Sequence, residues 1–454
     1  MATKDFTSGE EGRQIINFAI PIITGSVFMQ LYHYTDSVIV GRFIGKEALA
    51  AVGASTPFVF MLVALVIGIS MGTTIIISQC FGRKQYEPIK RAADSLYIFL
   101  LISAVILTVL GIIFNHDIMR FINLPEEIQP YASEYLNIYL LGLIFLFGFN
   151  SLSAILRGVG DSKTPLLFLI VSSVLNIILD LLFVVVFKWG IAGAAWATNI
   201  AQASAVIFGI IYVNKHNHLV KLDLRHLSFD KTLFIRSIKL GLPAGMQQLF
   251  VSFGMLAIVG LVNGFGTDVI AAYSAASRIE TFVCIIPMNL SIALTTFTGQ
   301  NFSAGKIDRV RKGLHSTIKT SLIASFIILL VLSAFARPLM NMFVPEPSVI
   351  EVGCQYLIVL GLSFWLFSIM FCYMGTLRGM GNTIAPMFIS LITLWIIRIP
   401  VASLLSSHIG ELGIWVSSSI SWFIGMIAAI IIFYRTTKTS KTLQNSINIP
   451  EEIF

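Results

Sequence analysis

Long apolar runs, separated by short polar segments, dominate the chain. A helix that spans a bilayer needs about 20 mostly apolar residues, and twelve runs reach that length. Their approximate extents are 14–40, 48–80, 93–115, 132–156, 165–187, 190–214, 234–264, 269–300, 316–336, 352–377, 385–407 and 410–434. The second, seventh and eighth runs exceed what a bilayer requires, so we expect these helices to tilt, bend or protrude. The pattern predicts an all-α polytopic membrane protein with twelve transmembrane helices.

Composition strengthens this interpretation. Charged residues make up 12% of the 454 residues and hydrophobic residues 56%, with a mean hydropathy of +0.86. A soluble domain carries about 25% charged residues, so a soluble enzyme, a nucleic-acid binder and a secreted disulfide scaffold are excluded. The four cysteines lie in or beside apolar runs without metal-type spacing, which favours a packing role.

The basic residues predict the orientation of the chain. Of the 30 Lys and Arg residues, 23 lie in the two termini or in loops on the same side of the membrane as the termini. By the positive-inside rule, both termini are expected to be cytoplasmic, and an even number of spans agrees with this. The polar, mixed-charge residues before the first run do not have the pattern of a cleavable signal peptide, so we expect none. We expect a multi-pass protein of the bacterial inner (plasma) membrane.

The chain repeats itself at an offset of about 221 residues. The segment 156–165 (LRGVGDSKTP) recurs as 377–386 (LRGMGNTIAP). Shorter matches at offsets of 220 to 222 residues pair Gln79 with Gln300, Pro21 with Pro243, and Gly190 with Gly410. Each repeat holds six spans, so the two bundles should share one orientation and be related by a pseudo-two-fold axis along the membrane normal.

The repeat also predicts the domain organisation. Residues 1–214 form an N-terminal six-helix lobe and residues 240–454 a C-terminal six-helix lobe. The basic segment 215–239 is too charged to span the membrane and is expected to be a cytoplasmic linker between them.

These residues resemble the multidrug and toxic compound extrusion (MATE) transporters. The two LRGxG(D/N)(S/T)xxP segments after the fourth and tenth spans carry the resemblance most specifically. Pro21 and Asp36 in the first span and residues 176–180 in the fifth add to it, and it covers nearly the whole chain. The resemblance implies a V-shaped pair of six-helix lobes that exports cationic or amphipathic compounds in exchange for Na⁺ or H⁺.

Three acidic residues lie well inside the apolar runs, namely Asp36, Asp180 and Glu280. Charges are costly there and mark functional sites by default. Asn176 and Asp180 are four residues apart and share one helix face, and no Lys or Arg lies within four residues of Asp180. Its carboxylate must be neutralised by a proton, a cation or a partner. Asp94 and Glu134, by contrast, lie near span ends, where we expect water to reach them.

In the MATE family, an Asp on the first span, an Asn and an Asp on the fifth and a Thr on the sixth form a cation site. The resemblance places that cation-coupling site at Asp36, Asn176, Asp180 and Thr198. Two nearby carboxylates in a low dielectric cannot both stay charged, so at least one is expected to carry a proton. With sodium coupling, Asp36, Asn176 and Asp180 would instead bind Na⁺. The choice between H⁺ and Na⁺ stays open, as does a purely structural, hydrogen-bonded role.

The second half lacks this acidic pair. At the repeat offset, Asp180 corresponds to Val401 and Asn176 to Ile397. We therefore expect ion coupling to be confined to the N-terminal lobe.

Several further residues are candidates for contact with substrate. Glu280 either binds a cationic substrate or pairs with a basic residue, and Arg398 in the eleventh span is a candidate structural charge partner. Tyr32, Tyr139 and Tyr273 are candidates for contact with a lipophilic cation through cation–π attraction, although most aromatic residues in such a chain face lipid or core.

Pro21 lies inside the first span, where it removes a helical hydrogen bond and predicts a kink. One hypothesis is that protonation of Asp36 or Asp180 changes the bend at Pro21 and reshapes the N-terminal lobe. A static kink is the alternative.

The favoured function is a cation-coupled (H⁺ or Na⁺) antiporter that exports cationic or amphipathic toxic compounds by alternating access. A flippase of lipid-linked saccharides is the alternative, although it should concentrate Arg and Lys within its spans, whereas the deepest charges here are mainly acidic. An embedded enzyme is disfavoured because the seven histidines show no metal spacing or nucleophile–base set within the spans. We expect no enzymatic activity, no cofactor beyond the transported ion, no nucleic-acid partner, contact with membrane lipid, and a monomer.

Overall fold

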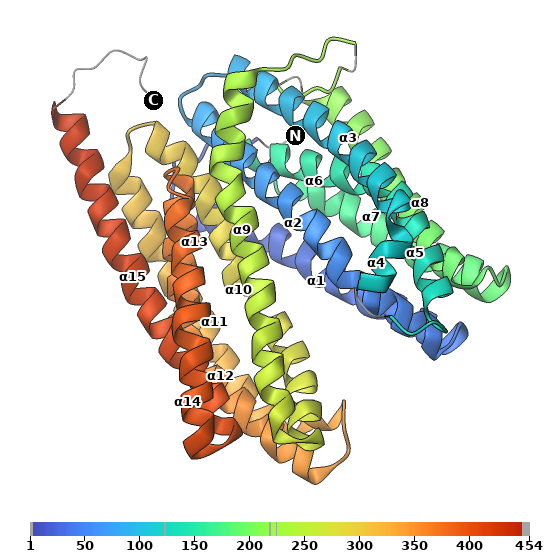
Figure 1. Ribbon diagram of the computed structural model, residues 1–454. Coiled ribbons are helices and arrows are strands. Elements are labelled where there is room, and N and C mark those ends of the chain that lie inside the picture. The colour runs from blue at the N-terminus through green and yellow to red at the C-terminus, as the bar shows by residue number, and fades with distance from the viewer. Residues whose placement is uncertain (1–2, 122–123, 218, 224, 447–454) are drawn as a thin grey trace. The chain divides into compact units, whose positions relative to one another are not determined.

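The computed structural model describes residues 3–121, 124–217, 219–223 and 225–446, and these form helices and no strands (Figure 1). The α-helices of the first half are α1 (Glu11–Phe43), α2 (Lys46–Gly82), α3 (Glu87–Ile113), α4 (Asn115–Phe121), α5 (Gln129–Leu141), α6 (Leu143–Gly158), α7 (Lys163–Asp180) and α8 (Gly190–His216). Those of the second half are α9 (Lys231–Val262), α10 (Thr267–Ser303), α11 (Ile307–Asn341), α12 (Pro347–Gly379), α13 (Ile384–Leu391), α14 (Ile399–Ile409) and α15 (Glu411–Ser446). Two π-helices, Leu181–Val186 and Ile392–Arg398, and a 3₁₀ turn, Asn263–Phe265, complete the order.

Hydropathy identified the membrane spans correctly. Within the described residues, eleven helical stretches are long and apolar enough to cross a membrane, and the bent pair α5 and α6 brings the number to as many as twelve. The outer face of α3 shows the physical reason, because Leu101, Val105, Ile106 and Val109 are about half exposed and all apolar. Such a face would be unfavourable in water and fits lipid. The all-α polytopic prediction is confirmed.

The chain folds into two compact units. The first holds Asn17–Leu249 and the chain before Gly9, and the second holds Gly9–Ile16 and the chain from Phe250 onward. Helix α9 runs through the boundary between Leu249 and Phe250, and because it begins at Lys231, the last part of the expected linker is helical. The segment Gly9–Ile16 joins the second unit through Arg309 of α11. The Arg309 guanidinium donates to Glu11 Oε1 at 3.0 Å and to the Gly9 carbonyl at 2.9 Å.

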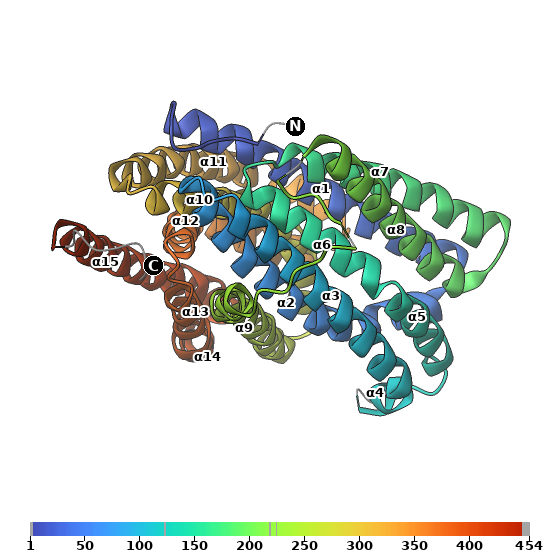
Figure 2. The same cartoon turned by 90° about the horizontal axis from the view of Figure 1, so that it is seen from above.

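Each unit has a central helix. In the first, α2 packs against α3, α5 and α6, which lie side by side in the view from above (Figure 2). In the second, α12 packs against α10, α11 and α15. The core of the first unit lies among α2, α3, α5 and α6, where Ile76, Leu96, Leu136 and Phe147 are buried.

The internal repeat reappears in the contacts of each unit. Thr74 Oγ1 in α2 donates to the Ala154 carbonyl in α6 at 2.9 Å. In the second unit, Thr295 Oγ1 in α10 donates to the Gly375 carbonyl in α12 at 3.0 Å. Both partners of the second bond lie 221 residues after those of the first. The packing of α2 on α6 is therefore reproduced by α10 on α12.

Both copies of the LRGxG motif form the same turn. Gly160 and Gly381 have φ angles of 82° and 90°, in the left-handed region that favours glycine. The side chain of the next residue then accepts a hydrogen bond from the first turn of the following helix. Asp161 Oδ1 and Asn382 Oδ1 accept hydrogen bonds from the backbone N–H three residues later, at 3.0 and 3.2 Å.

The fourth span departs from the prediction of one continuous helix over 132–156. It is bent by 48° where α5 meets α6 at Gly142. A side chain at Gly142 would overlap the Asn199 amide of α8, whose Nδ2 donates to the Ile138 carbonyl. On the other side, Thr108 Oγ1 of α3 donates to the Leu140 carbonyl at 2.6 Å. These two side chains satisfy carbonyls at the break, which makes it tolerable inside a membrane protein.

The expectation that Asp94 is solvated was wrong. Asp94 on α3 is 1% exposed, and described residues just before α9 pack against it. Lys90 lies 3.1 Å from its carboxylate, and the Ser228 hydroxyl donates to the same group at 3.3 Å. The next residue on α3, Ser95, accepts a hydrogen bond from the Asp230 N–H at 2.9 Å. The basic linker is thereby fixed to the first unit.

Candidate functional site

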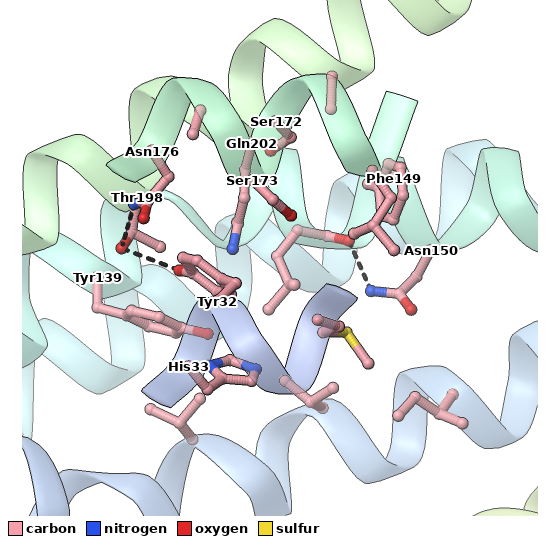
Figure 3. Close-up of a pocket in the computed structure, with 18 of the residues that line it drawn as sticks. Tyr32, His33, Tyr139, Phe149, Asn150, Ser172, Ser173, Asn176, Thr198 and Gln202 are labelled. Atoms are coloured by element: carbon pink, nitrogen blue, oxygen red, sulfur yellow. Dashed lines mark hydrogen bonds between the residues drawn. The ribbon is translucent and has the colours of Figure 1, made fainter. Parts of the chain in front are cut away.

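Three side chains from three helices of the first unit meet at one point. Tyr32 comes from α1, Asn176 from α7 and Thr198 from α8 (Figure 3). The Thr198 hydroxyl oxygen lies 3.2 Å from the Tyr32 hydroxyl and accepts a hydrogen bond from Asn176 Nδ2 at 3.4 Å. We call these three residues the hydrogen-bonded layer. It joins two of the four residues predicted for cation coupling to one predicted for contact with substrate.

Two carboxylic acids lie one helical turn beyond this layer. Asp36 follows Tyr32 on α1, and Asp180 follows Asn176 on α7, so each acid is about 6 Å further along its helix. Asp36 is 9% exposed and Asp180 is fully buried. The two carboxyl groups lie within hydrogen-bonding reach of each other, so a proton on one can be shared with the other. We call Asp36 and Asp180 the acid pair.

The acid pair offers oxygen atoms without partners. Asp36 Oδ1, both carboxylate oxygens of Asp180 and Asn176 Oδ1 are buried with no hydrogen-bond donor among the described residues. Neither acid belongs to an ion pair in that part of the chain. A buried, uncompensated carboxylate costs several kcal/mol, on the order of the penalty for any buried ion. The pair is therefore stable only when a proton or a cation neutralises it.

These oxygens also fit a hard metal ion. Carboxylate and amide oxygens are the donors that hard cations prefer. No group of three or more His, Cys, Asp or Glu side chains is placed to bind a metal within the residues that the structure describes. A cation at the acid pair would therefore also need the oxygens of Asn176 and Thr198. The same atoms can instead hold a proton, so the donor set admits both ions.

A π-helix begins directly after the acid pair. Helix α7 ends at Asp180, and Leu181–Val186 continues it with the wider turn of a π-helix. Such segments occur frequently at functional sites, and the added residue shifts the register of side chains that follow it. Hydropathy alone does not distinguish this segment from an α-helix, so the sequence pattern did not predict it.

A cavity of about 370 Å³ lies on the other side of the hydrogen-bonded layer. That volume is within the range of about 300–1,000 Å³ typical of sites for drug-sized molecules. Aromatic and aliphatic side chains line it, together with a few neutral polar groups (Figure 3). The lining includes Tyr32, His33, Tyr139, Phe149, Asn176 and Thr198. Among the described residues that line it, none is Asp, Glu, Lys or Arg.

The break between α5 and α6 positions one wall of this cavity. Tyr139 lies on the last turn of α5 and lines the cavity, as Tyr32 does on α1. Tyr135, one turn earlier, stacks on Tyr139 with ring centroids 5.9 Å apart. Two of the three tyrosines proposed from the sequence therefore face one cavity. Neither Tyr135 nor the supporting Asn199 was anticipated, because their positions depend on the bend at Gly142.

The remaining candidates lie in the second unit. Glu280 accepts a hydrogen bond from the Tyr356 hydroxyl. Tyr273 stacks on Trp415 with ring centroids 5.7 Å apart and rings nearly parallel at 3°. Arg398 is 4% exposed and forms no ion pair with Glu280 among the described contacts. Glu280 and Tyr273 thus sit in a buried aromatic cluster, and contact with substrate stays a prediction for both.

Pro21 lies inside α1, which continues through it to Phe43. Pro243 occupies the equivalent place inside α9. The proposed change of bend at Pro21 also stays a prediction.

Comparisons with known proteins agree with this architecture. A family model described as MatE matches residues 21–182 and again 243–404. The chain is 30% identical over 436 residues to the probable multidrug resistance protein YpnP of Bacillus subtilis, covering 96% of this chain and 97% of that protein. It is 28% identical over 436 residues to the probable multidrug resistance protein NorM of Thermotoga maritima, covering 94% and 90%.

Solved structures share the fold. The outward-facing conformation of a multidrug resistance MATE family transporter of the MOP superfamily aligns with a TM-score of 0.91 at 22% identity, covering 96% of this chain and 98% of that one. The fold is thus that of a multi-pass membrane protein. The chain belongs to the MatE family of multidrug efflux transporters.

Proposed function

We propose that this chain is a cation-coupled antiporter that exports cationic or amphipathic compounds by alternating access. The coupling ion, H⁺ or Na⁺, binds at Asp36, Asn176, Asp180 and Thr198. One observation carries the proposal: two buried carboxyl groups, without a basic partner among the described residues, lie one helical turn from a drug-sized cavity.

The electrostatics of this arrangement explain how ion and substrate would exchange. When the acid pair carries negative charge, its field draws an organic cation into the cavity, since the layer between them contains only neutral groups. When a proton or Na⁺ neutralises the pair, that attraction disappears and the substrate is released. Each ligand therefore weakens the binding of the other, which is the reciprocal coupling that an antiporter requires.

The cavity walls suit a lipophilic cation. Tyr32 and Tyr139 present aromatic rings to the cavity, and cation–π attraction contributes about 0.5–2 kcal/mol per ring in such places. A headgroup that carries pyrophosphate would instead require Lys or Arg side chains, and the described residues that line the cavity include neither. This contrast favours the exporter over the flippase.

The proposal also covers the membrane, the orientation of the chain, its oligomeric state and the bend of α1. The basic loops support a plasma-membrane protein with both termini in the cytoplasm. We further propose that it acts as a monomer and that Pro21 allows α1 to change its bend during the cycle.

Transport by the purified protein in proteoliposomes tests the proposal. Efflux of tetraphenylphosphonium would be measured under an imposed pH gradient or an imposed Na⁺ gradient for wild type, Asp36→Asn and Asp180→Asn. Glu134→Gln is the matched control, because its carboxyl is exposed on α5. We expect one gradient to drive efflux in wild type and control and in neither Asn variant. Efflux that persists in both Asn variants would place coupling elsewhere.

A further inference from the structure

Among the described residues that line the cavity, one side chain ordinarily titrates near neutral pH, and it is His33. It follows Tyr32 on α1, and the two ring centroids are 4.8 Å apart at an interplanar angle of 47°. Figure 3 shows the His33 ring among the side chains that line the cavity. No described residue forms a hydrogen bond with either ring nitrogen. Both nitrogens are therefore available to whatever molecule occupies the cavity.

An imidazole in this position has two distinct states. When neutral, it offers one acceptor nitrogen and one donor N–H. When protonated, it offers two donors and a positive charge. Because no Asp, Glu, Lys or Arg is among the described lining residues, protonation of His33 changes the formal charge of that lining from zero to plus one.

The other titratable groups around His33 come from three helices. They are Tyr32 and Asp36 on α1, Tyr135 and Tyr139 on α5, and Asp180 on α7. The part of α2 that faces the cavity is apolar, and the lining residues of α6 and α8 are uncharged. The tyrosines remain neutral over the physiological pH range, so the acid pair and His33 are the groups that can change the charge near the cavity.

We infer that His33 sets the charge selectivity of this cavity. With His33 neutral, the cavity accepts an organic cation against Tyr32 and Tyr139. With His33 protonated, it rejects that cation and favours an anion of the same shape. This inference deepens the proposed function and rests on it. Proton uptake at His33 acts in the same direction as proton uptake by the acid pair, because both make the cavity more positive and release the cation.

The size of the effect follows from Coulomb's law. Two unit charges about 7 Å apart at an effective dielectric constant of about 20 repel strongly enough to weaken binding more than tenfold. A cavity of this volume holds its ligand at about that separation from His33 or closer, since its linear dimension is of the order of 7 Å. We therefore expect a loss of at least tenfold in affinity for a cation when His33 is protonated.

Two ligands of similar shape and opposite charge test the inference. Tetraphenylphosphonium and tetraphenylborate have nearly the same shape, opposite permanent charges and no titratable group. Their dissociation constants would be measured by equilibrium dialysis between pH 5 and pH 8. The protein would carry Asp36→Asn and Asp180→Asn, so that the acid pair cannot contribute to the pH dependence. The same series would be repeated with His33→Gln added and, as a control, with His116→Gln, whose histidine is exposed on α4 outside the cavity.

On acidification we expect affinity for the phosphonium to fall about tenfold or more and affinity for the borate to rise. His33→Gln should abolish both responses, and His116→Gln should leave both intact. Opposing responses that survive His33→Gln would overturn the role of His33 while leaving the cavity as the substrate site. If neither ligand binds the wild type at any pH, the proposed function and this inference fail together. Should the double Asn protein not fold, the same measurements on wild type and on His33→Gln alone decide the question. The pH dependence of ligand affinity should be smaller in His33→Gln than in wild type.

Discussion

Substitution of Thr198 removes the hydrogen bonds of the layer with the least change in side-chain shape. Replacing Thr198 with Val keeps the shape of the side chain but removes the hydroxyl oxygen. That oxygen lies 3.2 Å from the Tyr32 hydroxyl and accepts from Asn176 Nδ2 at 3.4 Å. Thr198→Val therefore deletes two hydrogen bonds, whereas Tyr32→Phe deletes one and Thr198→Ser deletes none.

The expected magnitude follows from these two bonds. A neutral hydrogen bond contributes about 0.5–1.5 kcal/mol net, and the 3.4 Å bond is longer than usual and belongs at the low end. Thr198→Val should thus cost about 1–2 kcal/mol, which corresponds to a loss of roughly fivefold to thirtyfold in apparent affinity for the coupling ion. Tyr32→Phe should cost about 1 kcal/mol, or roughly fivefold.

The assay is the ion concentration that half-saturates efflux of tetraphenylphosphonium from proteoliposomes. Because both substitutions remove the same Tyr32–Thr198 bond, the double variant should lose little more than Thr198→Val alone. Thr198→Ser should behave as wild type. If Thr198→Val kept the ion affinity of wild type, a role of the hydrogen-bonded layer in ion binding would be refuted. A double variant whose loss equals the product of the two single losses would show that the tyrosine hydroxyl acts independently of Thr198.

Three further predictions concern other parts of the molecule. Gly241→Ala should lower thermal stability, because its methyl group would overlap the Gly68 carbonyl where α9 crosses α2, and overpacking costs about 1–3 kcal/mol. Gly260→Ala on the same helix meets open space and should melt as wild type, so equal melting of both variants would contradict this packing. Pro21→Ala should bind tetraphenylphosphonium normally but export it several-fold more slowly, and an unchanged efflux rate would exclude bending at Pro21 as a step of the cycle. Glu280→Gln should leave the driving ion unchanged, since Glu280 lies in the second unit, and loss of gradient-driven efflux would show that coupling is not confined to the first unit.

Hydropathy and repeats anticipated much of this molecule because both are properties of whole segments. The cost of placing polar groups in lipid acts on every residue of a span, so twelve apolar runs were visible without any tertiary information. The acid pair could also be predicted from the sequence, because the neighbours of Asp180 along the chain are apolar and cannot compensate its charge. The repeat predicted the paired LRGxG turns, which Gly160 and Gly381 form with the same backbone geometry.

Features that depend on one particular contact were not visible. The bend at Gly142 exists because Asn199 from a distant helix occupies the space beside that glycine and hydrogen-bonds to α5. Asp94 is buried where Ser228, more than a hundred residues later in the chain, packs against its carboxylate. The sequence did not distinguish His33 from other polar residues in the spans, because its cavity is formed by α2, α5 and α7, which are distant in sequence. A window of local sequence holds no information about such partners.

Exchange between substrate and coupling ion at the acid pair can be measured directly. Tetraphenylphosphonium would be added to the purified protein in weak buffer near neutral pH, and the number of protons released would be measured. In parallel, the affinity of the protein for tetraphenylphosphonium would be measured at increasing Na⁺ concentrations. We predict either release of roughly one proton per bound cation or competition by Na⁺, with both effects absent in Asp36→Asn combined with Asp180→Asn. Stoichiometric binding by the wild type with neither proton release nor competition by Na⁺ would contradict coupling at the acid pair.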